Sequence, residues 1–224
     1  MRKFDGVADT LFIPLNGRIQ VSKRFPEYFY DEKALSLESS IPGSSLQEQT
    51  SEFNLLSSAA RYHNMDQIMQ GFIDRHPACN LVILGCGLET AYDRMDRKQA
   101  QFYEMDLPQV IEGRRKVLGE RENETLIPGD LFDLRWADGI HKDRPTLILV
   151  SGVFQYFKEE KIIDFILFIR LFSTRVAKST HTTSFFCITQ IFNLLTNTSN
   201  RLLISIRSYS YDISINTGNL LYKH

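Results

Sequence analysis

The amino-acid sequence predicts an α/β fold with a mostly parallel sheet, because short apolar runs alternate with segments of helical periodicity over residues 57–172. The apolar run Asn80–Leu84 is stopped by the turn Gly-Cys-Gly, as expected for a strand that is buried on both faces. A second apolar run, at residues 146–150, is followed by Ser-Gly. Parallel strands of this kind are joined by right-handed crossovers, which cover the sheet with helices.

The other elements follow in chain order. Apolar residues recur at helical spacing from about residue 57, and Pro77 ends this helix. The further expected elements are a strand at residues 100–105, a helix at 109–121 with its charges outward, a strand at 125–127 and a helix at 158–172.

The N-terminal and C-terminal segments lack this rhythm. Residues 1–50 predict an irregular, partly helical lead-in, and the serine-rich run at residues 35–50 predicts a mobile surface connection. After residue 172 no strand or helix is indicated. Asp212 is the single acidic residue from residue 165 to residue 224, although the whole chain has 27. The aromatic side chains expected to anchor the lead-in to a core are Phe25, Tyr28, Phe29 and Tyr30.

The composition is that of a globular protein, with 43% hydrophobic and 24% charged residues. A formal net charge of −1 disfavours nucleic acid as an obligatory partner, because nucleic-acid-binding domains carry a basic excess. No apolar stretch approaches the roughly 20 residues of a membrane span, and the first residues show no signal-peptide pattern. Three cysteines without CxxC spacing favour a cytoplasmic location.

A candidate ligand site lies in the turn after the first strand. In a doubly wound sheet, ligands bind beyond the carboxyl ends of the strands, at the point where the strand order reverses. Gly85 and Gly87 lack a Cβ atom, so the backbone can turn sharply there and approach a ligand closely. A tight turn without a ligand is the simpler alternative for two glycines alone.

An acidic residue at the end of the second strand makes the site more specific. Asp106 comes 19 residues after Gly87, near the spacing that places a carboxylate on a ribose hydroxyl. Glu104 is the neighbouring candidate on the same face. A dinucleotide fingerprint would need a third glycine where Thr90 stands, so an adenosyl ligand without pyrophosphate is favoured over NAD. Asp130, after the third strand, can accept a hydrogen bond from an adenine amino group or can serve as a turn former.

Six ordered segments resemble one family. They are GVADTLFIPLNGR, AARYHNMDQ, LVILGCGLET, FYEMDLPQVI, PGDLFD and LVSGVFQYF, and they cover roughly residues 5–170. In this order and spacing they resemble the leucine carboxyl methyltransferase family, and more narrowly its bacterial branch with O-methyltransferases of polyketide biosynthesis. The resemblance implies a Rossmann-like class I methyltransferase fold, S-adenosylmethionine as the cofactor, and a small-molecule methyl acceptor with a carboxylate or hydroxyl group, or a peptide terminus.

The resemblance also implies a role for particular residues. Arg61 would reach the methionine carboxylate of the cofactor, which suits a guanidinium fork. Asp106 would hold the ribose, and Asp130 and Leu131 would flank the adenine. Many family members have a glutamate where Ser151 stands, and a serine can still form a hydrogen bond there. The implied cofactor contacts are Arg61, Gly85, Gly87, Asp106, Asp130, Leu131 and Ser151.

The same comparison divides the chain into an N-terminal segment on the substrate side (residues 1–56), an S-adenosylmethionine-binding α/β domain (57–172) and an atypical tail (173–224). The tail does not resemble the family's further strands, so the C-terminal strands of the sheet are expected to be missing or replaced. A truncated or frameshifted product is the hypothesis that this tail suggests.

The sequence assigns no catalytic residue. The candidate bases His63, His141 and His181 are candidates by residue type alone, and Cys86 fits a small space-filling residue better than a nucleophile. No residue pattern has metal-ligand spacing, and nothing indicates the oligomeric state. The alternatives are a catalytically impaired cofactor-binding remnant, suggested by Ser151 and the tail, and an NAD(P)-dependent oxidoreductase.

Overall fold

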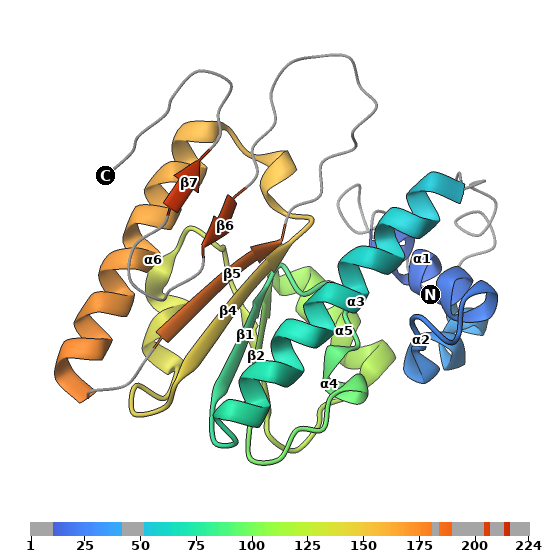
Figure 1. Ribbon diagram of the computed structural model, residues 1–224, viewed down its shortest axis with the longest axis horizontal. Coiled ribbons are helices and arrows are strands. Elements are labelled where there is room, and N and C mark those ends of the chain that lie inside the picture. The colour runs from blue at the N-terminus through green and yellow to red at the C-terminus, as the bar shows by residue number, and fades with distance from the viewer. Residues whose placement is uncertain (1–10, 42–51, 181–183, 190–203, 207–212, 216–224) are drawn as a thin grey trace.

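The computed structural model describes residues 11–41, 52–180, 184–189, 204–206 and 213–215 of the 224-residue chain (Figure 1). Five parallel strands form one sheet in the order β3-β2-β1-β4-β5. The strand order therefore reverses between β1 and β4. The strands are β1 (Asn80–Leu84), β2 (Gln101–Asp106), β3 (Glu124–Pro128), β4 (Thr146–Ser151) and β5 (Ser184–Thr189).

Helices cover both faces of the sheet (Figure 1). The α-helices are α1 (Phe12–Arg24), α2 (Glu32–Ser36), α3 (Glu52–Arg75), α4 (Ala91–Arg94), α5 (Pro108–Leu118) and α6 (Glu159–Thr180). Three short 3₁₀ helices are η2 (Glu38–Ser40), η3 (Leu134–Gly139) and η4 (Phe154–Tyr156). A separate antiparallel pair consists of β6 (Ile204–Ile206) and β7 (Ile213–Ile215). The predicted fold class and the positions of the four predicted strands are confirmed.

The alternation of side chains along the strands builds two cores. Leu81 and Ile83 of β1 belong to one cluster, which contains residues of α3, α4 and α5. Val82 and Leu84 belong to the other, which contains residues of η3 and α6. Every residue of β1 is buried, so the strand lies at the centre of the domain, as its unbroken apolar run predicts.

The N-terminal lead-in is more regular than the sequence predicts. Its helix α1 spans 13 residues, and α2 is capped by Asp31, whose side chain accepts a hydrogen bond from the Ala34 amide. Of the four anchoring aromatic residues only Phe29 is buried, while Tyr28 and Tyr30 are about half exposed. The interpretation of residues 35–50 as a surface connection is wrong for residues 35–41. The end of α2 and the whole of η2 lie there, and Leu37 and Ile41 are buried. Residues 42–50 lie outside the described residues.

These N-terminal helices pack onto the sheet domain. Residues of α1 and α2 share one apolar cluster with Leu88, from the turn after β1, and with Leu118, at the end of α5. Ile19 of α1 is fully buried in this cluster. The lead-in therefore completes the core around the turn that follows β1.

The expectation that C-terminal strands are missing or replaced is corrected for one strand. The predicted helix at 158–172 continues to Thr180, and β5 then pairs with β4 in parallel over six residues, from Thr146↔Ser184 to Ser151↔Thr189. The segment Ser184–Thr189 is rich in aromatic and β-branched residues, which pack well on a pleated surface. The prediction missed this strand because it relied on the scarcity of acidic residues after residue 172. Pairing between strands does not depend on acidic side chains.

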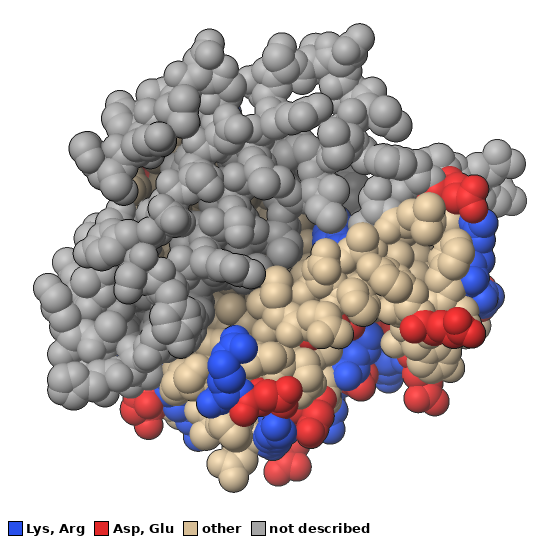
Figure 2. All heavy atoms as spheres, viewed as in Figure 1, with Lys and Arg blue, Asp and Glu red and all other residues tan. Residues whose placement is uncertain are grey.

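The charged side chains on the face shown in Figure 2 lie mainly along its lower and right-hand edges, with acidic and basic residues next to one another. The ion pairs of the described residues include Lys98–Asp74 and Lys116–Glu112. Within the described part of the chain, no helix has the length and apolar content that a membrane span requires.

Replacement of Ile19 by alanine should destabilise the fold by about 2–4 kcal/mol, because it leaves a cavity between α1 and the sheet domain. Urea denaturation monitored by circular dichroism measures this change. Ile13→Ala is the matched control, since Ile13 lies in the same helix but is 49% exposed, and it should change the free energy of unfolding by less than about 0.5 kcal/mol. Equal effects of the two substitutions would contradict the packing.

Candidate functional site

The turn after β1 and the loop after β4 meet at the point where the strand order reverses. Gly85 and Gly87 have φ angles of +70° and +49°, a region that favours glycine. A Cβ atom on Gly85 would lie 2.2 Å from Cγ2 of Val153, so no side chain fits between the two loops. Gly152, which the sequence does not single out, also has a positive φ of +70°. These glycines allow the backbones of the two loops to approach each other at the carboxyl end of the sheet.

Asp106 is held against this turn. It is the last residue of β2, its Oδ2 accepts a hydrogen bond from the Gly87 amide at 2.8 Å, and its Oδ1 accepts one from the Leu107 amide at 2.7 Å. Burial raises the pKa of Asp106, and the two amide hydrogen bonds oppose this effect. The carboxylate is thereby fixed at the rim of the sheet with further acceptor capacity on both oxygens.

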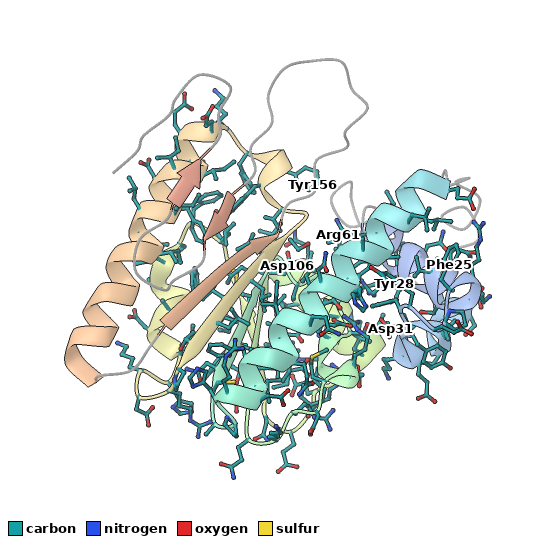
Figure 3. The ribbon with its side chains drawn as sticks, viewed as in Figure 1. Phe25, Tyr28, Asp31, Arg61, Asp106 and Tyr156 are labelled. Carbon is teal, nitrogen blue, oxygen red and sulfur yellow. The ribbon has the colours of Figure 1, made fainter. Side chains whose placement is uncertain are left out.

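Arg61 reaches the same rim from α3 (Figure 3). Its Nη1 lies 4.0 Å from the position of a Cβ on Gly152, and its Nη2 donates to the Tyr62 hydroxyl at 3.0 Å. Its guanidinium stands 4.8 Å from the centre of the Tyr62 ring. The Nε of Arg61 is buried and has no hydrogen-bond partner among the described residues. A buried donor in this state favours an anionic ligand beside Gly152.

The remaining predicted contacts lie on the neighbouring loops. Asp130 is exposed, and its Oδ1 accepts a hydrogen bond from the Phe132 amide at 2.9 Å, so it acts as a turn former. One such bond leaves acceptor capacity for a ligand. Leu131 is buried, and Ser151 is the partly buried last residue of β4. The Gly129 amide donates to the Asp106 carbonyl oxygen at 2.9 Å, which ties the loop after β3 to the end of β2.

A buried arginine of α5 binds the backbone of the turn. Arg114 of α5 is completely buried, which corrects the expectation that the charges of this helix all point outward. It contacts the carboxyl groups of Glu104 and Glu124, and it donates to the carbonyl oxygens of Gly87 and Glu89. A glutamate inside an apolar strand was the available signal, because a buried carboxyl group requires a polar partner.

A second buried ion-pair cluster lies between the turn and the N-terminal helices. Glu89 pairs with Arg18 at 3.4 Å and with Arg94 at 2.9 Å. Burial opposes the charged form, but these two arginines lower the pKa of Glu89 to about 2. Asp31 and Asp66 complete the cluster by pairing with Arg94, each at 2.8 Å. Glu89 thus joins the turn to the N-terminal helices.

The two described histidines considered as bases do not lie in this arrangement, whereas Cys86 lies within the glycine turn itself. His63 stacks on Tyr28 and its Nδ1 contacts the Tyr28 carbonyl oxygen at 3.0 Å. His141 lies beside Asn80, at the opposite end of β1. Burial keeps Cys86 as a neutral thiol by raising its pKa. His181 lies outside the described residues, and no cluster suited to a metal ion occurs among the residues that are described.

Tyr156 follows β4 in η4 and is 63% exposed, at the same edge of the sheet as Arg61 and Asp106 (Figure 3). An exposed aromatic ring at this place is available to a bound molecule. The described residues therefore combine an anchored carboxylate, a guanidinium with an unpaired donor and a close-packed glycine turn.

The leucine carboxyl methyltransferase family matches residues 21–169, well over half of the 224 residues. The chain is also similar to the tetracenomycin polyketide synthesis O-methyltransferase TcmP of Streptomyces glaucescens, with 26% identity over 160 residues. The match covers 70% of this chain and 58% of that relative, so the chain spans little more than half of the relative's length.

Similar solved structures are also methyltransferases by name. The mitomycin 7-O-methyltransferase MmcR is 15% identical with a TM-score of 0.38, over 86% of this chain and 45% of that chain. The plantazolicin methyltransferase BpumL, in complex with a pentazolic desmethylPZN analogue and SAH, is 12% identical with a TM-score of 0.38, over 81% of this chain and 61% of that chain. These scores are too low for a comparison of individual site residues.

Replacement of Glu104 by glutamine should remove a pH-dependent loss of stability. Burial raises the pKa of Glu104 to about 8 against the attraction of Arg114, whereas a glutamate in an unfolded chain has a pKa of about 4.3. Between these values the folded protein binds more protons than the unfolded chain. Its free energy of unfolding therefore falls as the pH rises, by up to about 1.4 kcal/mol per pH unit.

Urea denaturation across this pH window measures the effect. The wild-type chain should lose stability with rising pH more steeply than Glu104→Gln. Glu122→Gln, at an exposed position after α5, should keep the wild-type slope. Identical slopes for wild type and Glu104→Gln would contradict the raised pKa.

Proposed function

Because the chain belongs to the leucine carboxyl methyltransferase family, we propose that it binds S-adenosylmethionine and transfers its methyl group to an oxygen atom of an acceptor. The single observation that best supports this proposal is the Arg61 guanidinium, whose Nη1 lies 4.0 Å from the position of a Cβ on Gly152 and whose Nε has no partner among the described residues. The cofactor carries an anionic carboxylate at one end and a ribose with two hydroxyl groups near the other. The side chains of Arg61 and Asp106 match these groups chemically.

Arg61 is proposed to bind the carboxylate of the cofactor. A guanidinium is planar and always charged, so it suits a carboxylate in a partly buried site. Its free Nε would gain a partner that the described protein residues do not provide. The Tyr62 hydroxyl and ring hold the guanidinium in place, which reduces the conformational entropy lost on binding.

Asp106 is proposed to accept hydrogen bonds from the ribose hydroxyls. Each oxygen of the ionised carboxylate already accepts one backbone amide and can accept another donor. Gly85 and Gly87 would pack under the cofactor, in a turn where a Cβ on Gly85 would already meet Val153. The proposed adenine contacts are Asp130 and Leu131, and Ser151 is proposed as a hydrogen-bonding residue at the end of β4.

When bound, S-adenosylmethionine supplies a methyl group that is activated by a positively charged sulfur. The residues of this chain then need to align the acceptor oxygen and exclude water. A carboxylate acceptor requires no general base, whereas a hydroxyl acceptor benefits from one. We propose a small-molecule carboxylate or hydroxyl, or a peptide terminus, as the acceptor. The polyketide O-methyltransferase relative supports the small-molecule alternative.

The N-terminal segment (residues 1–56) is proposed to face the acceptor, together with the exposed ring of Tyr156. The balanced charge supports a protein without an obligatory nucleic-acid partner. The cysteine pattern supports a cytoplasmic location.

Isothermal titration calorimetry of the chain with S-adenosylmethionine and with NAD tests the proposed ligand. We expect heat of binding for the first and none for the second. Methyl transfer to a panel of carboxylate and phenolic acceptors, followed with a radiolabelled methyl group, tests the activity. Binding of NAD in preference to S-adenosylmethionine would refute the proposal.

Replacement of Asp106 by alanine should weaken binding of S-adenosylmethionine by about 1–3 kcal/mol, because hydrogen bonds to a charged acceptor are lost. Calorimetric titration measures the change. Asp106→Asn should have a smaller effect, since its amide oxygen can still accept the Gly87 amide. An unchanged affinity of Asp106→Ala would count against the ribose assignment.

Replacement of Arg61 by alanine should weaken S-adenosylmethionine binding by a similar amount, about 1–3 kcal/mol, and leave the affinity for 5′-methylthioadenosine nearly unchanged. The latter compound lacks the carboxylate that Arg61 is proposed to bind. Arg75→Ala, at an exposed position of the same helix, is the matched control and should bind both ligands normally. Equal losses for the two ligands would contradict the assigned partner of Arg61.

A further inference from the structure

We propose that Arg18 and Arg114 are positioning residues that together orient the cofactor-binding turn at Gly87, Leu88 and Glu89. This inference rests on the proposed function, because it concerns how the turn presents itself to the cofactor. Neither arginine lies at the mouth of the site, and both are buried, with exposed fractions of 2% and 0%. Their role would therefore be exerted through the backbone of the turn.

The two guanidinium groups bind three successive carbonyl oxygens. Arg18, from α1, donates to the Leu88 carbonyl oxygen at 2.6 Å. Arg114, from α5, donates to the carbonyl oxygens of Gly87 and Glu89 at 3.2 Å and 2.6 Å. Since a peptide group is planar, fixing its carbonyl also fixes the direction of the following N–H. The orientation of the turn is thus set from two sides by buried cations.

The turn is also hydrogen-bonded to Asp106, a proposed cofactor contact. The Gly87 amide donates to Asp106 at 2.8 Å, while the Gly87 carbonyl accepts from Arg114. A shift of this residue would therefore move the carboxylate that is proposed to hold the ribose.

Arg18 also supports the other proposed contact. The Tyr62 ring lies between two guanidiniums, 5.2 Å from that of Arg18 and 4.8 Å from that of Arg61. The hydroxyl of the same tyrosine accepts a hydrogen bond from Arg61. Arg18 is consequently linked by direct contacts to the support of Arg61 and to the turn that holds Asp106.

The pattern of partners requires arginine at these positions. Arg18 contacts Asp31 and Glu89 as well as the Leu88 carbonyl, and Arg114 contacts Glu104 and Glu124 as well as two carbonyls. A guanidinium has five donors in a rigid plane, whereas a lysine ammonium has three donors at one point. Lysine would preserve the charge but could not reach the carboxylates and the carbonyl oxygens together.

The substitution Arg18→Lys tests the proposal in the complete chain, with Arg24→Lys as the matched control. Arg24 lies in the same helix, is 45% exposed and pairs with Glu52 rather than with the turn. Titration calorimetry with S-adenosylmethionine, well below the melting temperature of each variant, should show affinity reduced about tenfold for Arg18→Lys. Arg24→Lys should change it by less than about twofold.

Two further readouts separate positioning from stability alone. Hydrogen exchange of the Gly87 amide in the ligand-free chain should become at least about tenfold faster in Arg18→Lys and stay unchanged in Arg24→Lys. In an Asp106→Ala background, Arg18→Lys should weaken binding by less than about threefold, since the two residues act through the same turn. A normal affinity of Arg18→Lys, or losses that multiply in full with Asp106→Ala, would overturn the proposal.

If Arg18→Lys does not fold, Arg114→Lys provides the same measurements, with the exposed neighbour Arg115→Lys as its control. A wild-type chain that does not bind S-adenosylmethionine would refute the proposed function. Faster Gly87 exchange in the lysine variants would in that case still support the orientation of the turn, and unchanged exchange would refute it. The two failures are therefore distinguishable.

Discussion

The parallel pairing of β1 with both β2 and β4 is the constraint on which the site depends. Leu84 is in register with Met105 on one side and with Val150 on the other. The residues that follow these three positions therefore lie together at the carboxyl end of the sheet, and they include Gly85 and Asp106. The strand order reverses between β1 and β4, and this is the place where ligands bind in doubly wound sheets. The two loops lie in close contact there, since Gly85 carries no side chain.

Buried charge is the second constraint. Transferring a guanidinium or a carboxylate from water into a protein interior costs several kcal/mol, and only good geometry and additional hydrogen bonds offset this cost. Here each buried arginine is shared between carboxylates and backbone carbonyl oxygens. The ion pairs consequently do more than neutralise one another, because they also satisfy the carbonyl groups of a turn that has no secondary structure of its own. The stability of the fold and the shape of the turn thus depend on the same side chains.

The N-terminal helices belong to this arrangement. Leu88 of the turn is buried among apolar residues of α1 and α2, and the Arg18–Glu89 and Arg94–Asp31 pairs cross the same boundary. In Figure 1 these helices lie beyond α3, at the side of the domain where α3, α4 and α5 also lie. A segment that is proposed to face the acceptor is therefore bonded to the turn that is proposed to face the cofactor. The proposed acceptor side and the proposed cofactor side are thus connected through the backbone of one turn.

The sequence by itself determined the fold class, the four strands from β1 to β4 and the family, because apolar periodicity and ordered motifs are local properties of the chain. It also predicted that glycines and acids at the strand ends form the site, since such residues occupy fixed places in a doubly wound sheet, and their binding roles stay predictions. Whether Asp130 binds adenine or only forms a turn stays a prediction. The scarcity of acidic residues after residue 172 led to the wrong prediction that no strand follows. Strand β5 forms there because it pairs with β4, a contact between segments far apart in the sequence.

Only the tertiary structure revealed the partners of Arg18, Arg94 and Arg114. Arg18 meets Glu89 from 71 positions away, and Arg114 meets the Glu89 carbonyl oxygen from 25 positions away. In a sequence, an arginine on a helix indicates a solvated face, because most arginines are exposed. Whether such an arginine is buried depends on which carboxylates and carbonyl oxygens the fold brings within reach. The local sequence pattern does not determine these contacts, because the partners are far apart in the chain.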